Sequence, residues 1–218
     1  MIEIRGVTKS YKTTHGRRFV FRDLSFVIPE GRNVAIVGRN GAGKSTLMRL
    51  LGGQDSPDSG KIVTRKTISW PVGLSGGFQG SLTGRQNVKF VARVYGARND
   101  RMREVVRYVE EFAELGEYFD QSVNTYSSGM RGRLAFGLSM AFDFDYYLVD
   151  EAMSVGDARF KTKATTEFRK KTNKANIILV THGMTQVRSL CDMVLLLNGG
   201  KIQYFDNVEE GIAAYTAL

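Results

Sequence analysis

The stretch VAIVGRNGAGKST, residues 34–46, places a strand pattern, a glycine-rich turn and the start of a helix pattern in direct succession. Its first four residues are apolar, which predicts a short strand buried on both faces, as in a parallel sheet. Residues 38–45 match the spacing GxxxxGK(S/T) of a phosphate-binding loop. The overlapping KSTLMRLLGG, residues 44–53, predicts a helix that ends at the two glycines. The stretch therefore predicts an α/β fold in which strand, loop and helix together form a phosphate site.

The loop has the chemistry that a chain of phosphates requires. Its successive backbone N–H groups and the N-terminus of the following helix favour the negative charge of a β-phosphate. Lys44 adds a positive charge between the β- and γ-phosphates, and the Ser45 hydroxyl is a ligand for Mg²⁺. A chance glycine turn is disfavoured because the strand, loop and helix patterns occur together. We expect nucleotide contacts from Gly38, Asn40, Gly41, Ala42, Gly43, Lys44, Ser45 and Thr46.

A second apolar strand pattern, YYLVDE at residues 146–151, ends in two carboxylates. We expect Asp150 to hold Mg²⁺, usually through water. Glu151, the next residue, is placed to polarise the water that attacks a γ-phosphate. An acidic pair at a strand end is often a solvated turn. After a phosphate-binding loop, however, the functional interpretation is favoured.

A third apolar strand pattern, NIILVTH at residues 176–182, ends in a threonine and a histidine. A single histidine at a strand end is more often structural than catalytic. The carboxyl ends of parallel strands are, however, where ligands bind in open α/β sheets. His182 is therefore a candidate to contact the γ-phosphate and to hold the attacking water in line.

The composition is that of one domain, or of one domain with a subdomain. The chain has 218 residues, of which 42% are hydrophobic, so it can bury a substantial core. The longest apolar runs are too short to cross a bilayer, and the first residues lack the apolar segment of a signal peptide. The single cysteine, Cys191, excludes an internal disulfide and fits a reducing cytoplasm, with a small buried residue as its expected role.

The formal net charge of the chain is +9, which favours an anionic partner such as nucleic acid or the inner face of a membrane. The basic residues are spread along the sequence, and this charge is also compatible with solubility alone. Charge therefore does not choose between partners.

The order of patterns along the chain indicates a sheet domain that is interrupted by helices. Residues 2–36 predict short strands, and residues 84–115 predict helices with apolar side chains at spacings of three and four. After the two later strand patterns, residues 192–205 predict a hairpin and residues 207–218 predict a helix. The middle of the chain therefore predicts an inserted helical subdomain.

A further helix opens on YSSGM, residues 126–130, and this stretch has two interpretations. It is an ordinary serine-rich turn that caps a helix, or its N–H groups and the positive end of the helix dipole bind an anion. The stretch lies about twenty residues before the acidic strand pattern. This order of motifs resembles the nucleotide-binding domain of ABC transporters, whose signature at this position is LSGGQ. The serine and the second glycine of that signature are kept here.

The resemblance covers essentially the whole chain and implies ATP and Mg²⁺ as cofactors. In this family the signature is offered across a dimer interface to the γ-phosphate that the partner's phosphate loop holds. The residues expected to contact the nucleotide of a second copy are Ser127, Ser128 and Gly129. SVGD, residues 154–157, resembles the family's D-loop, in which Asp157 would link the two sites.

Two further positions follow from the same resemblance. Tyr11 stands where the family has the aromatic residue that stacks on adenine, with a half-buried strand tyrosine as the alternative. The family usually has a glutamine about eight residues before the Leu-Thr of its Q-loop, and here that position is Leu74. Gln79 is the nearest candidate to take the role of that glutamine at the nucleotide and metal. Glycines in this segment favour a mobile loop: Gly73, Gly76, Gly77, Gly80 and Gly84.

The implied fold is an α/β P-loop NTPase of the ABC ATPase type. It has a RecA-like core, an antiparallel β subdomain and an inserted α-helical subdomain. We expect a single domain over residues 1–218, with a catalytic lobe of residues 1–83 and 142–218. The helical subdomain would comprise about residues 84–141.

Four stretches resemble the ATP-binding subunits of bacterial capsular polysaccharide exporters. They are GGFQGSLTGRQNV, the YSSGM signature, DEAMSVGD and the tail EEGIAAY. Exporters of O-antigen and of teichoic acid are close relatives in this resemblance. O-antigen exporters that recognise their glycan carry an added C-terminal carbohydrate-binding domain, so the end of this chain at Leu218 favours the capsule type.

The implied function is ATP hydrolysis that drives export of a lipid-linked glycan across the inner membrane, from its cytoplasmic face. The implied partners are a second copy of the chain and two copies of a polytopic permease, with periplasmic and outer-membrane export proteins as indirect partners. A short helix of the permease would dock near residues 74–95, in the groove between the sheet lobe and the helical subdomain. Candidate contacts are Phe78, Phe90, Val91 and Tyr95, with core packing expected for at least two of them.

Three other classes of protein fit the sequence less well. A small GTPase selects guanine with Asn-Lys-x-Asp, and NKAN at residues 173–176 lacks the aspartate. A nucleic-acid-acting ABC ATPase fits the positive charge, but that class has long coiled-coil insertions or two nucleotide domains in one chain. A non-enzymatic regulator is disfavoured because Glu151 and His182 are both present. No nucleic-acid partner is therefore expected.

Overall fold

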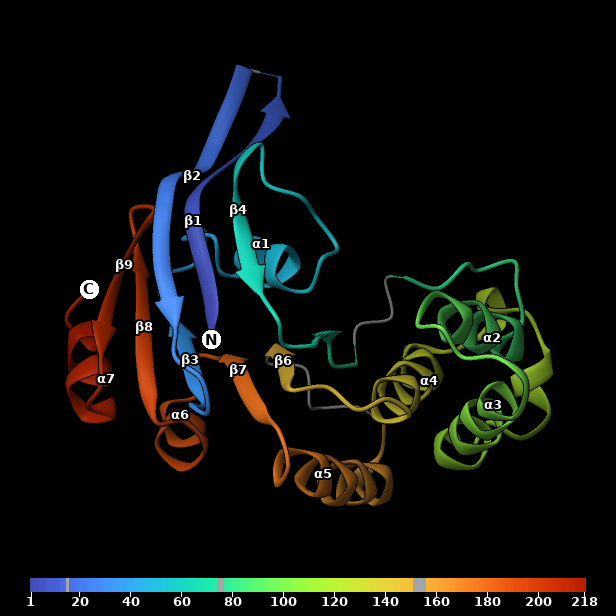
Figure 1. Ribbon diagram of the computed structural model, residues 1–218. Helices are drawn as coiled ribbons and strands as arrows, with labels where there is room; N and C mark the ends of the chain where they lie inside the picture. The colour runs from blue at the N-terminus through green and yellow to red at the C-terminus, as the bar shows by residue number, and fades with distance from the viewer. Residues whose placement is uncertain (15, 74–76, 151–155) are drawn as a thin grey trace. The chain divides into compact units, whose positions relative to one another are not determined.

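The computed structural model describes residues 1–14, 16–73, 77–150 and 156–218. Their contacts form two compact units, whose elements are drawn in Figure 1. The first, which we call the sheet unit, comprises Met1–Pro71, Phe144–Glu151 and Lys174–Leu218. The second, which we call the helical unit, comprises Val72–Asp143 and Ala152–Asn173.

An antiparallel sheet of three strands, in the order β2-β1-β4, forms one part of the sheet unit. Its strands are β1 (Ile2–Thr13), β2 (Gly16–Ile28) and β4 (Ser59–Thr64). In the second half of β2, buried Leu24, Phe26 and Ile28 alternate with exposed residues. Because the burial pattern repeats every two residues, one face of the sheet faces the core. β1 and β2 extend together past β4 as a long hairpin (Figure 1).

The other sheet of this unit has six strands in the order β5-β6-β7-β3-β8-β9. All neighbouring pairs are parallel except the hairpin of the last two strands. The strands are β3 (Val34–Val37), β5 (Ile68–Pro71), β6 (Tyr146–Asp150), β7 (Asn176–Val180), β8 (Met193–Asn198) and β9 (Lys201–Phe205). Every residue of β3 is buried, which explains why its sequence is apolar throughout and does not alternate.

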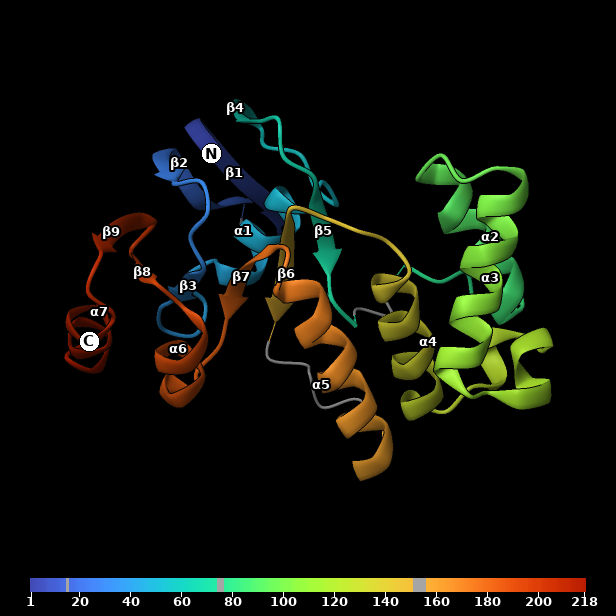
Figure 2. The same ribbon diagram turned by 60° about the horizontal axis from the view of Figure 1, so that its bottom comes forward.

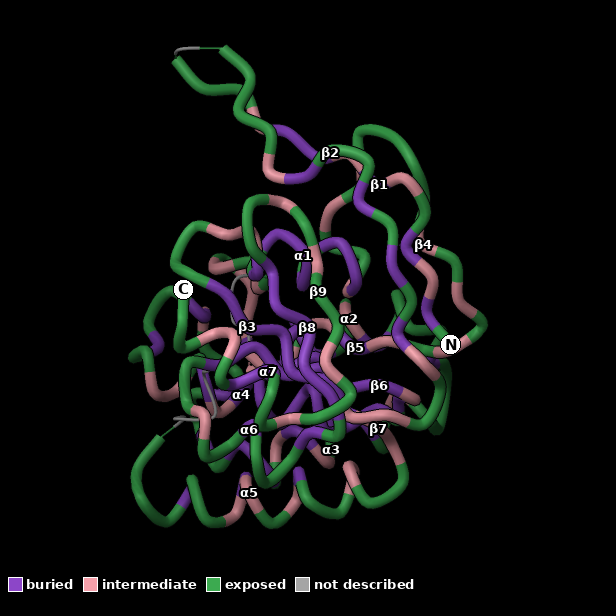
Figure 3. Tube along the Cα trace, turned by 90° about the vertical axis from the view of Figure 1, so that its left-hand side faces the viewer, coloured by how far each residue is buried: buried purple, intermediate pink, exposed green. Residues whose placement is uncertain are grey.

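One apolar core joins both sheets to α1 (Lys44–Leu51). Leu47 and Met48 of this helix belong to the same buried cluster as Phe26 of β2 and Ile178 of β7. Figure 3 shows the buried segments of β3 and β8 at the centre of the sheet unit. The unit is completed by α6 (Met184–Leu190) and α7 (Val208–Thr216). Cys191 is buried as expected, and burial raises the pKa of its thiol to about 12.

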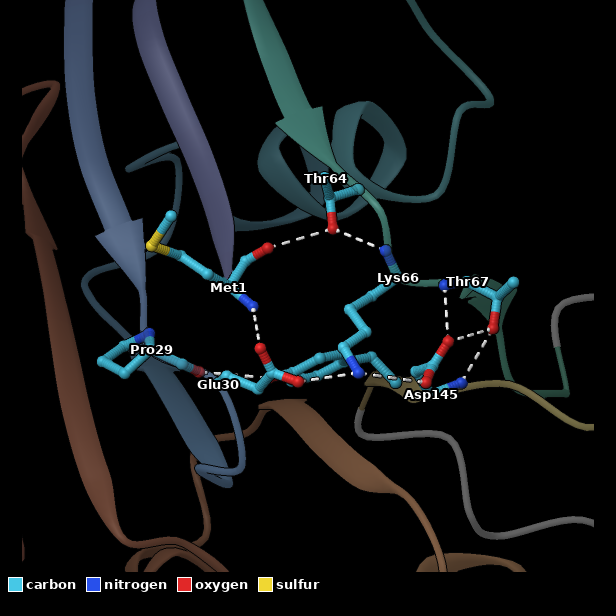
Figure 4. A network of polar contacts seen from close by, with 8 residues as sticks. Met1, Pro29, Glu30, Thr64, Lys66, Thr67 and Asp145 are labelled. Carbon is cyan, nitrogen blue, oxygen red and sulfur yellow. Dashed lines mark hydrogen bonds and ion pairs between the residues drawn. The ribbon is translucent and has the colours of Figure 1, made fainter.

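A polar network also ties the two sheets together at the chain start (Figure 4). Glu30 accepts from the N-terminal amine of Met1 at 3.4 Å and pairs with the Lys66 ammonium at 2.7 Å. Asp145, just before β6, accepts from the backbone and hydroxyl of Thr67 at 2.8 and 2.7 Å. Exposed pairs of this kind contribute only about 0–1 kcal/mol each. The ion pairs of this network therefore add little to the free energy of unfolding.

The helical unit contains four α-helices and two short 3₁₀ turns within the described ranges. They are α2 (Gly84–Val94), α3 (Asn99–Ala113), η1 (Gly116–Asp120), η2 (Val123–Thr125), α4 (Ser128–Met140) and α5 (Ala158–Thr172). Phe112 of α3 is central to its core, because its ring stacks on Phe136 at 5.9 Å and meets Phe160 edge-on at 5.5 Å. Aromatic pairs in these geometries stabilise beyond their buried area.

The expected α/β fold, with an antiparallel sheet and inserted helices, is confirmed. The domain boundaries differ from those expected in two respects. The helical unit begins at Val72, whereas we expected the catalytic lobe to extend to residue 83. We also expected residues 142–218 to belong wholly to the catalytic lobe, but α5 packs with the helical unit. The reason is side-chain packing, since Phe160 of α5 contacts Phe112 of α3. Sequence order alone gives no sign of that contact.

Candidate nucleotide site and signature segment

The phosphate loop connects β3 directly to α1, as its sequence predicts. Gly43, just before the helix, has φ 108°, a backbone conformation that favours glycine. A Cβ atom there would lie 2.7 Å from the side chain of Val20. At Gly38 a Cβ atom would lie 2.3 Å from the carbonyl oxygen of Leu197. Both glycines are therefore required for the loop to pass close to its neighbours.

Lys44 is folded back over this loop. Its Nζ donates to the carbonyl oxygens of Gly38 at 2.7 Å and Arg39 at 3.2 Å, and the residue is only 8% exposed. A buried ammonium needs such acceptors, because an unpaired charge in the interior costs several kcal/mol. The lysine is thus held at the loop in a position from which it can exchange carbonyl oxygens for phosphate oxygens.

A cavity of about 1270 Å³ is lined by residues 39–46 together with side chains from other parts of the sheet unit. This volume is somewhat above the ~300–1,000 Å³ of typical small-molecule sites. Tyr11, Asp150 and His182 line the same cavity. The structure therefore brings together four features that are far apart in the sequence. Basic side chains that the sequence analysis did not single out also line it: Arg18, Arg22, Arg39 and Lys201.

The parallel register explains why the acid and the histidine meet the loop. Val180 of β7 is paired with both Ile36 of β3 and Asp150 of β6, so the carboxyl ends of the three strands are level. In Figure 2 the arrowheads of β6 and β7 point to the same edge of the sheet. Glu151, the expected general base, lies outside the described residues. In the sequence it directly follows Asp150.

Tyr11 is held by a polar network that the sequence analysis did not predict. Its hydroxyl donates to Asp55 Oδ2 at 2.8 Å and accepts from Arg49 Nη2 at 3.0 Å. Asp55 Oδ1 accepts from Lys9 Nζ at 2.6 Å, and that ammonium also donates to the carbonyl oxygen of Ser56 at 2.7 Å. The network fixes the phenol at the cavity wall. The sequence signal that could have indicated this network is Lys9, a cation at an inward-facing position of an otherwise apolar strand face.

The hydrogen bond from Lys9 is the main reason that the pKa of Asp55 lies below its ordinary value of 3.8. We expect Asp55→Asn to lower the free energy of unfolding by about 1–3 kcal/mol near pH 7, because a largely buried ammonium loses its carboxylate partner. A carboxylate with a lowered pKa stabilises above its unfolded pKa, and this effect is lost as pH falls through the folded value. The difference in free energy of unfolding between wild type and Asp55→Asn, measured by urea unfolding, should therefore be smaller below pH 3 than at pH 7. Asp206→Asn, at an 85% exposed side chain, is the control. If Asp55→Asn changed the free energy of unfolding equally at both pH values, the pairing of Asp55 with Lys9 would be contradicted.

The signature segment lies in the helical unit, at the start of α4. Ser127 is the N-cap of this helix, and its Oγ accepts from the backbone N–H of Met130 at 3.2 Å. Tyr126 is buried and donates to the carbonyl oxygen of Tyr118 at 2.6 Å, which anchors the segment. The helix-capping interpretation is thus correct for Ser127. It does not exclude anion binding, because the first N–H groups of the helix face the same end.

A cavity of about 680 Å³ is formed at this helix start by residues 127–130 and by Asp157. Asp157 is the N-cap of α5, accepts from the N–H of Phe160 at 2.9 Å and pairs with Arg133 at 2.6 Å. The bond from the Phe160 N–H is the main reason that the pKa of Asp157 is lowered. The candidate D-loop and signature residues therefore line one cavity in the helical unit. Ser154 lies outside the described residues.

Comparison with known proteins decides the family. The family model described as ABC transporter matches residues 21–154. The chain belongs to this family. The polysialic acid transport ATP-binding protein KpsT of Escherichia coli is 57% identical over 216 residues, which cover 99% of this chain and 96% of that protein. The capsule polysaccharide export ATP-binding protein CtrD of Neisseria meningitidis is 43% identical over the full length of both chains.

More distant comparisons agree with this assignment. The O-antigen export system ATP-binding protein RfbB of Klebsiella pneumoniae is 34% identical over 95% of this ABC transporter chain and 85% of its own. The solved structure of the ATP-binding cassette MJ0796, a dimer in a post-hydrolysis state bound to ADP and Pi, superimposes with a TM-score of 0.72. It is 22% identical and covers 93% of this chain and 97% of its own, so it supports the fold.

The Q-loop region of this ABC transporter chain lies in the helical unit. Gln79 has an exposed side chain, whose Nε2 donates to Ser81 Oγ at 3.3 Å. Its backbone is fixed by Asn87, which accepts from the Gln79 N–H at 2.8 Å and donates to its carbonyl oxygen at 3.0 Å. Leu74 lies outside the described residues. A contact from Gln79 to nucleotide or metal therefore stays a prediction. Within the described ranges, none of the helices combines the length and apolar content that a membrane crossing needs.

Proposed function

We propose that the chain is the ATP-hydrolysing subunit of an ABC exporter for capsular polysaccharide, acting at the cytoplasmic face of the inner membrane. The observation that carries the ATPase assignment is the single cavity lined by the phosphate loop, Asp150 and His182. The glycan assignment rests on similarity to KpsT and CtrD over essentially the whole chain. Export of O-antigen or teichoic acid is the second candidate, supported by relatives about 34% identical to this chain.

The sheet unit binds ATP through charge and through the backbone. The N–H groups at the start of α1 and the Lys44 ammonium bind the β- and γ-phosphates. Tyr11, held by Asp55, stacks on adenine at the cavity wall. Ser45 and Asp150 both line the cavity, and their hydroxyl and carboxylate oxygens are donors that suit Mg²⁺. When bound, Mg²⁺ supplies positive charge to the phosphates.

Hydrolysis is assigned to two residues that follow β6 and β7 in the sequence. Glu151 accepts a proton from the attacking water as general base. His182 contacts the γ-phosphate and holds that water in line. Both follow strands whose register is fixed by pairing with each other, β6 with β7.

A second copy of the chain completes each site through its signature segment. Gly129 supports this assignment, because a Cβ atom there would contact only Ser127 Oγ, at 3.9 Å. Glycine costs about 1 kcal/mol relative to alanine in a helix interior, and it is a poor helix former in the first turn of α4, where Gly129 lies. Packing inside the described chain gives no reason for it. A γ-phosphate approaching the N-terminus of α4 gives one, since the closest approach of backbone to ligand needs glycine. Closure on ATP and opening after hydrolysis do work through different nucleotide affinities of the two states.

The permease is proposed to dock on α2. Phe90 and Val94 of this helix are 58% and 68% exposed, and its C-cap Tyr95 is 45% exposed, which gives the end of α2 an apolar surface. Phe78 and Val91, the other expected contacts, are half-buried. Exposed apolar patches of this kind mark protein interaction sites. Periplasmic and outer-membrane export proteins are proposed as indirect partners, reached through the permease.

Co-purification from membranes tests this assignment against a nucleic-acid role. We expect the full chain to co-purify with a polytopic membrane protein encoded in the same cell. Its retention on DNA or RNA should be weak at about 0.15 M salt. Tight binding to nucleic acid that weakens steeply with added salt, without a membrane partner, would instead support the nucleic-acid alternative.

Lys44→Ala is expected to weaken ATP binding by about 10- to 100-fold, the factor for one charge-assisted hydrogen bond of about 1.5–3 kcal/mol. Titration with a fluorescent ATP analogue measures the dissociation constant directly. Lys61→Ala, which removes an exposed lysine from β4, is the control. An unchanged dissociation constant in Lys44→Ala would show that the loop lysine does not bind the phosphates.

A further inference from the structure

The described part of the chain gives the candidate histidine a partner from the far end of the sequence. His182 Nδ1 lies 2.8 Å from the hydroxyl of Tyr215, with the two ring centroids 6.4 Å apart. Tyr215 is in the last turn of α7, 33 residues after the histidine. A hydrogen bond at this distance fixes one of the two nitrogens of the imidazole. The cavity residue is thus connected to the C-terminal helix.

The helix that carries Tyr215, α7, is packed firmly against β8 within the sheet unit. A Cβ atom at Gly211 would lie 2.5 Å from Cβ of Val194, so α7 approaches β8 as closely as a glycine allows. Arg188 of α6 makes a bidentate pair with Glu209, with distances of 2.7 and 3.0 Å. Figure 1 shows α6 and α7 side by side. Tyr215 is therefore positioned by a fixed helix and not by a loose chain end.

The chemistry of imidazole gives this contact a consequence at the other nitrogen. To donate to a phosphate oxygen, Nε2 must carry a proton, and in neutral imidazole Nδ1 is then an acceptor. The Tyr215 hydroxyl can donate to that acceptor. We propose that Tyr215 is a positioning residue that holds His182 in the Nε2–H tautomer and sets its ring orientation. This inference rests on the proposed contact of His182 with the γ-phosphate.

The contrast with Tyr204 separates this role from ordinary packing. The Tyr204 hydroxyl, on β9, bonds to the backbone N–H and carbonyl oxygen of Val27, at 2.5 and 3.0 Å. It therefore binds main-chain groups of β2, a strand of the other sheet. The Tyr215 hydroxyl pairs with a side chain that lines the nucleotide cavity. Removing each hydroxyl in turn therefore compares a tyrosine hydroxyl that contacts the nucleotide cavity residue His182 with one that contacts only the backbone.

The kinetic experiment uses the full chain with its membrane partner and compares Tyr215→Phe with Tyr204→Phe. We expect kcat for ATP hydrolysis to fall about tenfold in Tyr215→Phe, the factor for one ordinary hydrogen bond, with KM within about twofold of wild type. Tyr204→Phe should retain kcat. In His182→Ala the further change Tyr215→Phe should have no effect. An unchanged kcat in Tyr215→Phe, or losses that multiply in the double variant, would overturn the proposal.

A spectroscopic readout keeps this test separate from the role of the histidine in hydrolysis. The chain has two histidines, so the ¹⁵N signals of His182 are assigned by their loss in His182→Ala. At alkaline pH we expect the Nε2–H tautomer in wild type and a mixture of tautomers in Tyr215→Phe. The same tautomer ratio in both proteins would overturn the proposal. If the tautomer ratio shifted in Tyr215→Phe but His182→Ala hydrolysed ATP at the full rate, the contact of Tyr215 with His182 would stand. The proposed role of His182 in hydrolysis would then be wrong.

Discussion

Glu151→Gln is expected to bind ATP as tightly as wild type and to hydrolyse it about 10²–10⁴-fold more slowly, the contribution of one positioned general base. Glutamine keeps the shape of the side chain but cannot accept a proton from water. ATP should then remain bound between two copies, and the variant should accumulate as a dimer. Phosphate release measures the rate, and size-exclusion chromatography with ATP measures the dimer.

The control for this prediction is Glu117→Gln, at an exposed residue of η1. It changes the net charge by the same amount and should hydrolyse ATP at the wild-type rate. Sustained hydrolysis in Glu151→Gln would remove Glu151 as the base. Loss of ATP binding in that variant would mean that the carboxylate is needed for the nucleotide complex itself.

Ser128→Arg should reduce hydrolysis by about 10²–10³-fold, the effect of losing one donor to transition-state charge. Ser128 is exposed and is the first residue of α4, while the cap is Ser127. The substitution therefore leaves the helix cap intact and places a bulky side chain where the γ-phosphate of the partner copy would approach. Each monomer should still bind ATP, because the phosphate loop is unchanged. Gln121→Arg, at an exposed residue outside this cavity, is the matched control.

Mixing variants tests whether the two halves of a site come from different copies. In a head-to-tail dimer, a Lys44→Ala copy and a Ser128→Arg copy together form one site with both defects and one intact site. The mixture should therefore recover part of the activity that each variant lacks alone. Wild-type hydrolysis in Ser128→Arg, or no recovery on mixing, would contradict the cross-dimer role of the signature segment.

The sequence predicted the features that depend on local spacing. The phosphate loop is an example, because its glycines, lysine and serine act within one turn between a strand and a helix. The strands before Asp150 and His182 were equally clear, since a parallel strand buried on both faces needs a continuous apolar run. Their meeting at one edge then follows from a general property of parallel sheets.

Contacts between distant residues were not predictable in this way. Lys9 and Asp55 are 46 residues apart, and His182 and Tyr215 are 33 apart, so no motif spacing links them. The assignment of α5 to the helical unit depends on the contact of Phe160 with Phe112, which is set by packing. From the local sequence alone, each of these polar or aromatic residues would be interpreted as an ordinary strand or helix residue. The role of each residue follows only from the residue that it contacts in the folded chain.

The most direct test of the proposed function is made in the native cell. The gene is replaced by its Glu151→Gln form, and polysaccharide is measured at the cell surface and inside the cell. We predict that the surface polysaccharide is lost and that the glycan accumulates inside. An unchanged surface coat, in cells that contain the variant protein at the wild-type level, would contradict a role in polysaccharide export.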